Sequence, residues 1–436
     1  MTTPIANRHP GETCSEHQRR IELGAVLREH WLTGLIPFWR RHAVNENQGG
    51  FWPELLRDGA RFGDGSHALV PIARLVYAFA TAAGVTGDDE LLQIARGGMR
   101  QLARYFDPVS DAWYSRLSGS GGCLDPTIRP YGAAFAAYSL ATFGRIAGDA
   151  ESIDLADRSF RALWTRGRHP IHGGFWQELE PDWTPRLQEC RLDTHLHAME
   201  GCAALFAATG DQEWRRAWLE LSLIVTARTL NPNSGCVRER FHPDWSEKAA
   251  PGDPNINIGH NLEAAWFLFR SATVLEEPGL EDVGFRLLEY AIQMGAGDRD
   301  GATDRENAVN PMAGAFPTYP TTPPLLTPDR TPGHESPERH PQFTWWIQAE
   351  GLAALAIGYE IRPSHRLLTR LESLWICIRD RFYDPDFGGW YATIAWDGGP
   401  LDDRKGGDWK AVYHETQACL NAASALDGRF RPRQEL

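Results

Sequence analysis

The pattern of apolar and polar positions divides the chain into two alternating sets of helical segments. One set is rich in Ala, Leu and aromatic residues on almost every side, as in "RPYGAAFAAYSL", which is typical of a helix buried on most sides. The other set carries charge along one face, as in "DQEWRRAWLELSLIVTAR", which is typical of an amphipathic helix. We expect the buried set at 66–84, 130–147, 191–209, 258–275, 343–359 and 411–426, and the amphipathic set at 15–43, 88–106, 151–167, 212–230, 278–295 and 364–382.

A short motif of Gly or Asp followed by a strand-like aromatic triplet recurs between these segments. Clear copies are "QGGFWPEL" at 48–55, "HGGFWQEL" at 172–179 and "FGGWYATI" at 387–394. Weaker copies lie at 110–117 and 234–241, and a degraded one lies at 297–304. The first five copies begin about 62 residues apart, and the last interval is nearer 90; such a period is the signature of a repeat architecture.

Six buried helices alternating with six amphipathic ones predict an all-α fold, an (α/α)6 barrel of six inner and six outer helices. The repeated motifs are then short β-hairpins at one end of the barrel. We expect one catalytic domain over residues 15–430, with a disordered N-terminus at 1–14. The stretch 310–341 is too rich in Pro for a helix, so we expect an inserted loop over a barrel end.

Composition excludes several classes of function. The net charge is −13 and there is no basic run to neutralise phosphates, so no nucleic-acid partner is expected. No apolar stretch approaches the length of a membrane span, and the first 20 residues lack the apolar core of a signal peptide. The seven cysteines are scattered singly, which favours reduced thiols in a cytoplasmic protein.

Three of the predicted inner helices carry a histidine followed three residues later by Glu or Gln. Residues with this spacing share one helix face, and all three histidines lie near the start of their helices. Because the inner helices of such a barrel run the same way, these side chains are expected to converge at one end of its axis. The pairs are His197/Glu200, His260/Glu263 and His414/Gln417.

A single buried histidine is more often structural than catalytic, and an aromatic residue in such a helix is usually part of the core. The recurrence of three histidines at equivalent positions, with other polar and aromatic groups beside them, favours a functional site. We interpret Trp266, two turns below His260, as packing. The remaining candidates on the inner helices are Arg74, Tyr131, Trp346, Glu350 and Trp409.

Two imidazoles across a cavity suit proton transfer near neutral pH. A Glu at i+3 can accept a hydrogen bond from the far ring nitrogen of its His and fix the tautomer, so we expect Glu263 to do this for His260. Arg74 and a third histidine can hold an oxyanion, and Trp faces suit a sugar ring. These parts together predict enolisation of an open-chain sugar.

Other chemistries fit the sequence less well. A metal site is not expected, because there is no H-E-x-x-H and the di-iron motif has the reverse order, Glu-x-x-His. There is no G-x-S-x-G, no phosphate-binding loop and no dinucleotide fingerprint, so no cofactor is expected. An (α/α)6 glycoside hydrolase would need a pair of carboxylates, and it leaves the three histidines unexplained. A sugar-binding barrel that catalyses no reaction would also leave the three histidines unexplained.

The chain resembles the N-acylglucosamine 2-epimerase superfamily, which includes cellobiose 2-epimerases and mannose isomerases. The matching pieces occur in family order and cover about residues 20–427. They are "GGFWPEL", "ARLVYAF", "RPYGAAFAAYSL", "DTHLHAMEG", "IGHNLEAAW", "WWIQAEGLAAL" and "DWKAVYHETQACL".

The resemblance implies a cofactor-free reaction on a free reducing sugar of the glucose/mannose, N-acetylglucosamine or cellobiose type. His260 and His414 match the two general acid/base groups that act at C2 through a cis-enediolate. His197 matches a residue for ring opening and oxygen binding, and Arg74 matches the enediolate-binding Arg. The remaining candidates match the substrate shell or the support of the histidines: Tyr131, Glu200, Glu263, Trp346, Glu350 and Trp409.

The sequence departs from the family pattern at several points. Ile72 stands where Gln is common, and "HETQA" is nearer the isomerase branch, whereas "GHNLE" and "THLH" are nearer the cellobiose epimerase branch. An aldose–ketose isomerase of the mannose–fructose type, using the same residues, therefore stays open as the alternative. The expected partner is a small sugar, and the protein is expected to be a monomer or homodimer.

Overall fold

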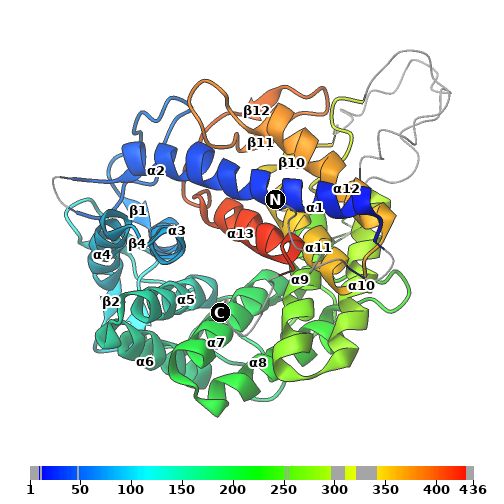
Figure 1. Cartoon of the computed structure of the whole chain (residues 1–436). Coiled ribbons are helices and arrows are strands. Elements are labelled where there is room, and N and C mark those ends of the chain that lie inside the picture. The colour runs from blue at the N-terminus through cyan, green and yellow to red at the C-terminus, as the bar shows by residue number, and fades with distance from the viewer. Residues whose placement is uncertain are drawn as a thin grey trace, which may run out of the picture.

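The computed structural model describes residues 9, 12–46, 49–250, 253, 255–295, 310–320 and 341–428, and helices dominate them. Helices that line the centre alternate along the chain with helices that surround them (Figure 1). The inner helices are α3 (Leu69–Thr86), α5 (Pro130–Ala147), α7 (Leu192–Thr209), α9 (Ile258–Leu275), α11 (Trp345–Ile361) and α13 (Tyr413–Leu426). The outer helices are α1 (Cys14–His30), α2 (Ile36–Ala43), α4 (Asp89–Ala103), α6 (Ala150–Arg166), α8 (Gln212–Ile224), α10 (Pro278–Met294) and α12 (His365–Cys377), with π-helical turns η1 (Trp31–Leu35), η2 (Val225–Thr229) and η4 (Ile378–Phe382).

The inner helices form a closed ring. Each one contacts the next in chain order, and α13 returns to contact α3. The first outer helix is continuous through η1 from Cys14 to Ala43, and it packs between α13 and α12. The inner helices are buried on nearly all sides because they face both the axis and the outer layer. This arrangement confirms the predicted (α/α)6 barrel, with helix ends within about three residues of those expected.

The repeated motifs form tight turns that follow the outer helices. In the described copies, a residue before the turn forms an antiparallel β-bridge with a residue after it, as Arg168 does with Phe175 and Tyr383 does with Trp390. The predicted degraded copy at 297–304 lies outside the described residues. The strands are short: β1 (His67–Ala68), β2 (Phe106–Asp107), β3 (Ala112–Trp113), β4 (Arg116–Leu117), β5 (Cys123–Asp125), β6 (Glu178–Leu179), β7 (Pro185–Leu187), β8 (Cys190–Arg191), β9 (Arg240–Phe241), β10 (Phe343–Thr344), β11 (Thr393–Ile394) and β12 (Pro400–Asp402).

These strands pair in three-stranded sheets β1-β4-β5 and β10-β11-β12 and in two-stranded pairs β2-β3, β6-β7 and β8-β9, all antiparallel. They also anchor the starts of inner helices. The first N–H of α7, on Leu192, donates to the carbonyl of Glu239 at 3.0 Å, and that of α11, on Trp345, donates to Ala392 at 3.1 Å. A helix start has N–H groups without intrahelical partners, so each hairpin satisfies one of them and fixes where the helix begins.

The ends of the predicted domain are described only in part. Residues 1–8, 10 and 11, and the inserted stretch 321–340, lie outside the described residues. The expected disorder of 1–14 does not extend to its last residues. Glu12 is buried and accepts hydrogen bonds from Arg20 and Tyr359, and Thr13 caps α1.

One helix among the described residues, α3, is long and apolar enough to cross a membrane by length and composition. Most of it is buried inside the barrel as an inner helix. Five of the seven cysteines are buried.

Candidate active site

The N-terminal ends of the inner helices surround a cavity of about 500 Å³. Eight of the ten predicted site residues line it, and the other two, Glu200 and Glu350, lie behind histidines. Trp345 also contributes to the wall, although it was not among the predicted residues. The eight are Arg74, Tyr131, His197, His260, Glu263, Trp346, Trp409 and His414.

Two histidines contact the ring of Trp346 in the cavity. The ring centroids of His260 and Trp346 are 4.9 Å apart, and those of His414 and Trp346 are 5.7 Å apart. His260 is the third residue of α9, and His414 is the second residue of α13, so both project from the first turn of their helices. The prediction that these two side chains meet at one end of the barrel is therefore confirmed.

Each of these two histidines is paired through Nδ1 with a carboxylate. His260 Nδ1 lies 2.6 Å from Glu239 Oε2, and His414 Nδ1 lies 2.6 Å from Glu350 Oε1. A carboxylate in this position holds the proton on Nδ1 and leaves Nε2 as the nitrogen that can accept a proton from a ligand.

One predicted pairing is wrong. Glu263, three residues after His260, does not hold that imidazole, because Glu239 from the hairpin before α9 does so. Gln417, three residues after His414, donates to Tyr138 and Glu200. Helix spacing places two side chains on one face, but it does not decide whether a closer group arrives from a neighbouring element.

Trp266 is also more than packing. Its indole Nε1–H donates to Glu350 Oε2 at 2.6 Å, so it helps to orient the carboxylate that holds His414. Trp266 is fully buried, and a buried indole N–H usually needs such an acceptor.

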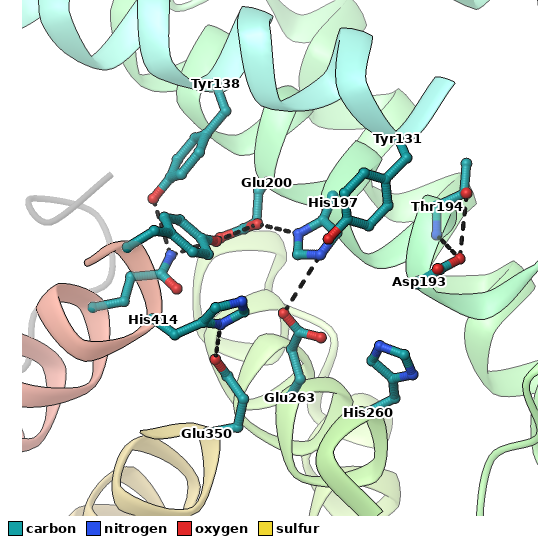
Figure 2. A network of polar contacts seen from close by, with 12 residues as sticks. Tyr131, Tyr138, Asp193, Thr194, His197, Glu200, His260, Glu263, Glu350 and His414 are labelled. Carbon is teal, nitrogen blue, oxygen red and sulfur yellow. Dashed lines mark hydrogen bonds and ion pairs between the residues drawn. The ribbon is translucent and has the colours of Figure 1, made fainter. Parts of the chain in front are cut away.

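The third histidine, His197, is part of a separate buried network (Figure 2). Its Nδ1 lies 2.7 Å from Glu200 Oε2, as the i+3 spacing predicts. Glu200 also accepts from the hydroxyl of Tyr413 at 2.6 Å and from Gln417 at 2.6 Å. On its other side, His197 Nε2 lies 3.8 Å from Glu263 Oε1.

Arg74 projects from α3 between the aromatic rings of Phe135 and Tyr413. It donates to the hydroxyl of Tyr131 at 2.8 Å and to the carbonyl of Trp409, and its Nε has no partner among the described residues. Trp409 itself is 59% exposed at the mouth of the cavity. A guanidinium held in this way has donor capacity left for a ligand oxygen.

The pKa values of the titratable groups in the site are shifted in different directions. Burial would lower the pKa of His260, but the Glu239 carboxylate raises that pKa above its ordinary value of 6.5. Burial, with nearby cations, lowers the pKa of His414 well below 6.5. Burial raises the pKa of Glu350 to about 8. Such opposed shifts within one cavity are typical of acid–base sites.

Glu263 is the least satisfied carboxyl group of the site. It is fully buried, and neither oxygen has a hydrogen-bond partner among the described residues. Burial, together with the neighbouring Glu350 and Glu200, raises its pKa well above 4.5. The neutral acid is therefore the favoured form of Glu263 in this cavity.

Glu263, Glu350 and His414 each bring one atom that could bind a cation within 4.8 Å of the other two. Glu350 and His414 are already joined by their own hydrogen bond, so we do not assign these residues as metal ligands. The expectation that the site uses no metal and no cofactor stays a prediction.

Sequence reasoning missed Glu239, although a signal for it exists. Glu239 lies in the fourth hairpin copy, 234–241, and its carbonyl caps α7 as those of Ser115 and Ala392 cap α3 and α11. In these three copies the repeat therefore places this position at the start of an inner helix, at the cavity end of the barrel. A carboxylate there, where other copies have Ser115 or Ala392, marks it as a candidate.

His195 lies beside the site, but its two ring nitrogens form hydrogen bonds with backbone groups only. Its Nδ1 lies 2.6 Å from the carbonyl of Arg191, and its Nε2 accepts from the N–H of Phe175 at 2.9 Å. Burial lowers its pKa to about 4. Both ring nitrogens are occupied, so His195 joins α7 to the third hairpin.

The chain is similar to known proteins over most of its length. The sequence profile of N-acylglucosamine 2-epimerase (GlcNAc 2-epimerase) matches residues 49–310 and 329–418. Cellobiose 2-epimerase of Bacteroides fragilis is 24% identical over 90% of this chain and 97% of its own length. D-mannose isomerase of Thermobifida fusca is 26% identical over 79% of this chain and 80% of its own. The solved structure of cellobiose 2-epimerase from Spirochaeta thermophila has a TM-score of 0.80 at 24% identity, covering 96% of this chain and 99% of that one.

Proposed function

The chain belongs to the N-acylglucosamine 2-epimerase family and is a sugar epimerase or isomerase, and from this premise we propose that it interconverts a free reducing sugar with its C2 epimer. One observation carries the proposal. The imidazoles of His260 and His414 both contact the ring of Trp346, and each is oriented through Nδ1 by its own carboxylate. Two oriented bases in one cavity are what deprotonation on one face of a carbon and reprotonation on the other require.

The reaction begins with an open-chain aldose, whose carbonyl at C1 makes the hydrogen at C2 acidic. One histidine takes this proton through Nε2, and the electron pair of the C–H bond forms a cis-enediolate. The enediolate turns about its C2–C3 bond, and the other histidine donates a proton to the opposite face of C2. The sugar skeleton keeps every atom, and no cofactor is needed.

Arg74 and His197 bind the oxygens of the substrate and the intermediate. The guanidinium of Arg74, steadied by Tyr131, places positive charge beside the developing O1 and O2 anion. His197, held by Glu200, binds a substrate oxygen and assists ring opening. Burial and the adjoining cations make these donors stronger than they would be in water.

The aromatic groups support a pyranose substrate. Trp346 contacts both histidines, and Trp409 lies exposed at the mouth. A second cavity of about 970 Å³ adjoins the first and shares Trp345 and Trp409 with it. The second cavity can hold a further sugar ring beyond the reacting one, which favours a disaccharide of the cellobiose type over a monosaccharide.

An aldose–ketose isomerase is the alternative, since the same residues can return the proton to C1 instead of C2. A glycoside hydrolase is less well supported. Glu200 and Glu350 are each bonded to a histidine, and Glu263 and Glu350 place oxygens within 4.8 Å of each other, closer than the separation of hydrolytic pairs. We further propose a monomer or homodimer that acts in the cytoplasm without nucleic acid or membrane.

Incubation of the protein with cellobiose, glucose, mannose, N-acetylglucosamine or fructose in D2O, followed by NMR, tests the proposal. We expect a C2 epimer carrying deuterium at C2. A ketose as the sole product would instead support the isomerase, and release of a reducing end from a glycoside without any exchange would contradict both. Dialysis against a chelator is expected to leave the rate unchanged, and loss of activity there would indicate a metal.

A further inference from the structure

Three buried carboxyl groups from three inner helices gather around His197 and His414 (Figure 2). They are Glu200 of α7, Glu263 of α9 and Glu350 of α11. Burial raises the pKa values of Glu263 and Glu350, and the neighbouring carboxyl groups raise them further. Which of these groups stays ionised therefore depends on the hydrogen-bond donors that each one receives.

The three carboxyl groups differ in their donors. Glu200 has three protein partners, and Glu263 has none among the described residues. Glu350 has two partners: its Oε1 lies 2.6 Å from His414 Nδ1, and its Oε2 accepts the indole N–H of Trp266 at 2.6 Å. Apart from the histidine that it orients, Glu350 thus relies on Trp266 alone among the described residues.

Trp266 supports the ionised form of Glu350. It is fully buried on α9, two turns after His260, and an indole ring offers a donor but no acceptor. A donor held against a carboxylate oxygen favours the charged carboxylate over the neutral acid. Burial raises the pKa of Glu350 to about 8, and the hydrogen bond from Trp266 acts in the opposite direction.

The ionisation of Glu350 decides which ring nitrogen of His414 is free. An ionised carboxylate accepts the Nδ1–H, so the neutral ring keeps its lone pair on Nε2. A protonated carboxyl group donates to Nδ1 instead, and the neutral ring then carries its proton on Nε2. His414 can take a proton from C2 only in the first of these states.

We propose that Trp266 is a positioning residue whose indole N–H keeps the proton off Glu350, so that His414 presents a free Nε2 to the sugar. The proposal rests on the proposed epimerase function. Trp266 does not line the cavity, so it acts on the reaction through Glu350. One helix, α9, then carries one proton-transfer group, His260, and controls the state of the other.

Other charged groups also act on the His414–Glu350 pair, and a substitution of Trp266 leaves them in place. They come from three inner helices and from the segment before α13: Arg74, His197, Glu200, His260, Glu263 and Lys410. A change in the titration of the pair in a Trp266 variant therefore measures the indole N–H.

Trp266→Phe removes this donor, and the pH dependence of turnover is the measurement. Loss of a hydrogen bond to a charged group makes the pair hold a proton more tightly, so the optimum of kcat/KM is expected to move upward by about one pH unit. Below the wild-type optimum, kcat should fall about tenfold, and the loss should shrink as the pH rises. KM should change little. A loss of kcat by the same factor at every pH would show a structural role and overturn the proposal.

Trp218→Phe is the matched control. Trp218 is a buried tryptophan of α8, and its indole N–H donates to the hydroxyl of Ser271 on α9 at 2.8 Å. The substitution removes the same ring and the same donor, but no carboxylate loses a partner. Its pH optimum is expected to match the wild type, and an equal shift in both variants would contradict the role of Trp266.

A second replacement separates the donor from the ring. Benzothienylalanine at position 266 carries sulfur where the indole has N–H, so it fills the same space without donating. It is expected to shift the pH optimum as Trp266→Phe does, and it keeps the test open if the smaller phenyl ring does not support folding. A wild-type optimum with this side chain would overturn the proposal.

The tautomer of His414 can be read without any sugar. In protein labelled with 15N-histidine, NMR follows the two ring nitrogens as the pH is raised, and His414→Asn identifies their signals. The proton of His414 is expected to move from Nε2 to Nδ1 at a higher pH in Trp266→Phe than in the wild type. Equal midpoints would overturn the proposal, whereas absence of any C2 epimer would instead contradict the proposed function.

Discussion

At the scale of single residues, Glu263 shows how a cavity can decide the protonation of a carboxyl group. Neither of its oxygens has a protein partner among the described residues, and its closest titratable neighbours include two more carboxyl groups. The charged form is opposed by burial and by like charge, so the acid form persists to higher pH than in the unfolded chain.

This shift predicts how stability depends on pH. Folded Glu263 keeps a proton that the unfolded chain releases above its ordinary pKa of 4.5. The wild type should therefore lose stability relative to Glu263→Gln as the pH rises above that value, by about 1.4 kcal/mol per pH unit until the raised pKa is reached. Urea unfolding of both proteins at several pH values measures the difference. Parallel curves would contradict a raised pKa.

The histidines give a second prediction at this scale. His260→Ala and His414→Ala are each expected to lower turnover at least about 10²-fold while the barrel stays folded, since each removes a proton-transfer group. His195→Ala is the control, because its ring nitrogens bind only backbone. It should lower the melting temperature and affect the turnover of folded protein much less. Near-native rates for the first two variants would contradict the two-histidine mechanism.

At the scale of elements, the hairpins matter because they place groups at the starts of the inner helices. Gly174, in the third hairpin, has φ +75°, and a Cβ there would lie 2.5 Å from Trp245 and 2.7 Å from His195 Nε2. Only glycine fits this approach, which lets the Phe175 N–H reach His195 and joins the hairpin to α7.

Gly174→Ala is therefore expected to destabilise the protein by more than Gly235→Ala. Gly235 lies in the next hairpin at φ +73°, but a Cβ there has no atom within 4 Å. The control, Gly235→Ala, should lower the free energy of unfolding by about 1–2 kcal/mol, because alanine must then adopt a left-handed backbone conformation. The extra loss in Gly174→Ala measures the steric contact with Trp245 and His195. Chemical denaturation compares the two, and equal losses would mean that the turn relaxes freely.

At the scale of the whole molecule, the first and last repeats are joined at the buried carboxylate of Asp384, which pairs with Lys405 of the last repeat and Arg57 of the first. Lys405 and Asp384 are almost fully buried and lie 3.1 Å apart, and Arg57, beyond the first hairpin, also binds Asp384. The backbone N–H of Lys405 donates to the carbonyl of Leu55. The segment that they fix leads to Trp409 at the mouth of the cavity.

Lys405→Met should destabilise the fold by about 3–5 kcal/mol, because it leaves the buried Asp384 with less positive charge nearby. It should also raise KM more than it lowers kcat, since it loosens the segment that carries Trp409 rather than the histidines. Lys248→Met, which breaks an ion pair between Glu189 and a 42% exposed lysine, should cost less than about 1 kcal/mol. Thermal unfolding and steady-state kinetics measure both effects, and equal losses for the two variants would contradict this role of Lys405.

The sequence by itself determined the alternating helices, the repeat and the end of the barrel at which the histidines meet. Burial patterns and turn signals are local, and an inner helix must be apolar on most sides wherever the neighbouring helices lie. Eight of the ten predicted site residues line the cavity for the same reason.

Only the tertiary structure decided which group holds each of the two imidazoles, His260 and His414. His260 is bound by Glu239, 21 residues earlier, and His414 by Glu350, 64 residues earlier, rather than by the residues three positions later. Hydrogen bonds depend on distances below about 3.2 Å, and such distances between helices and hairpins are set by how the ring closes. The same packing left one pair partly open to water and buried the other.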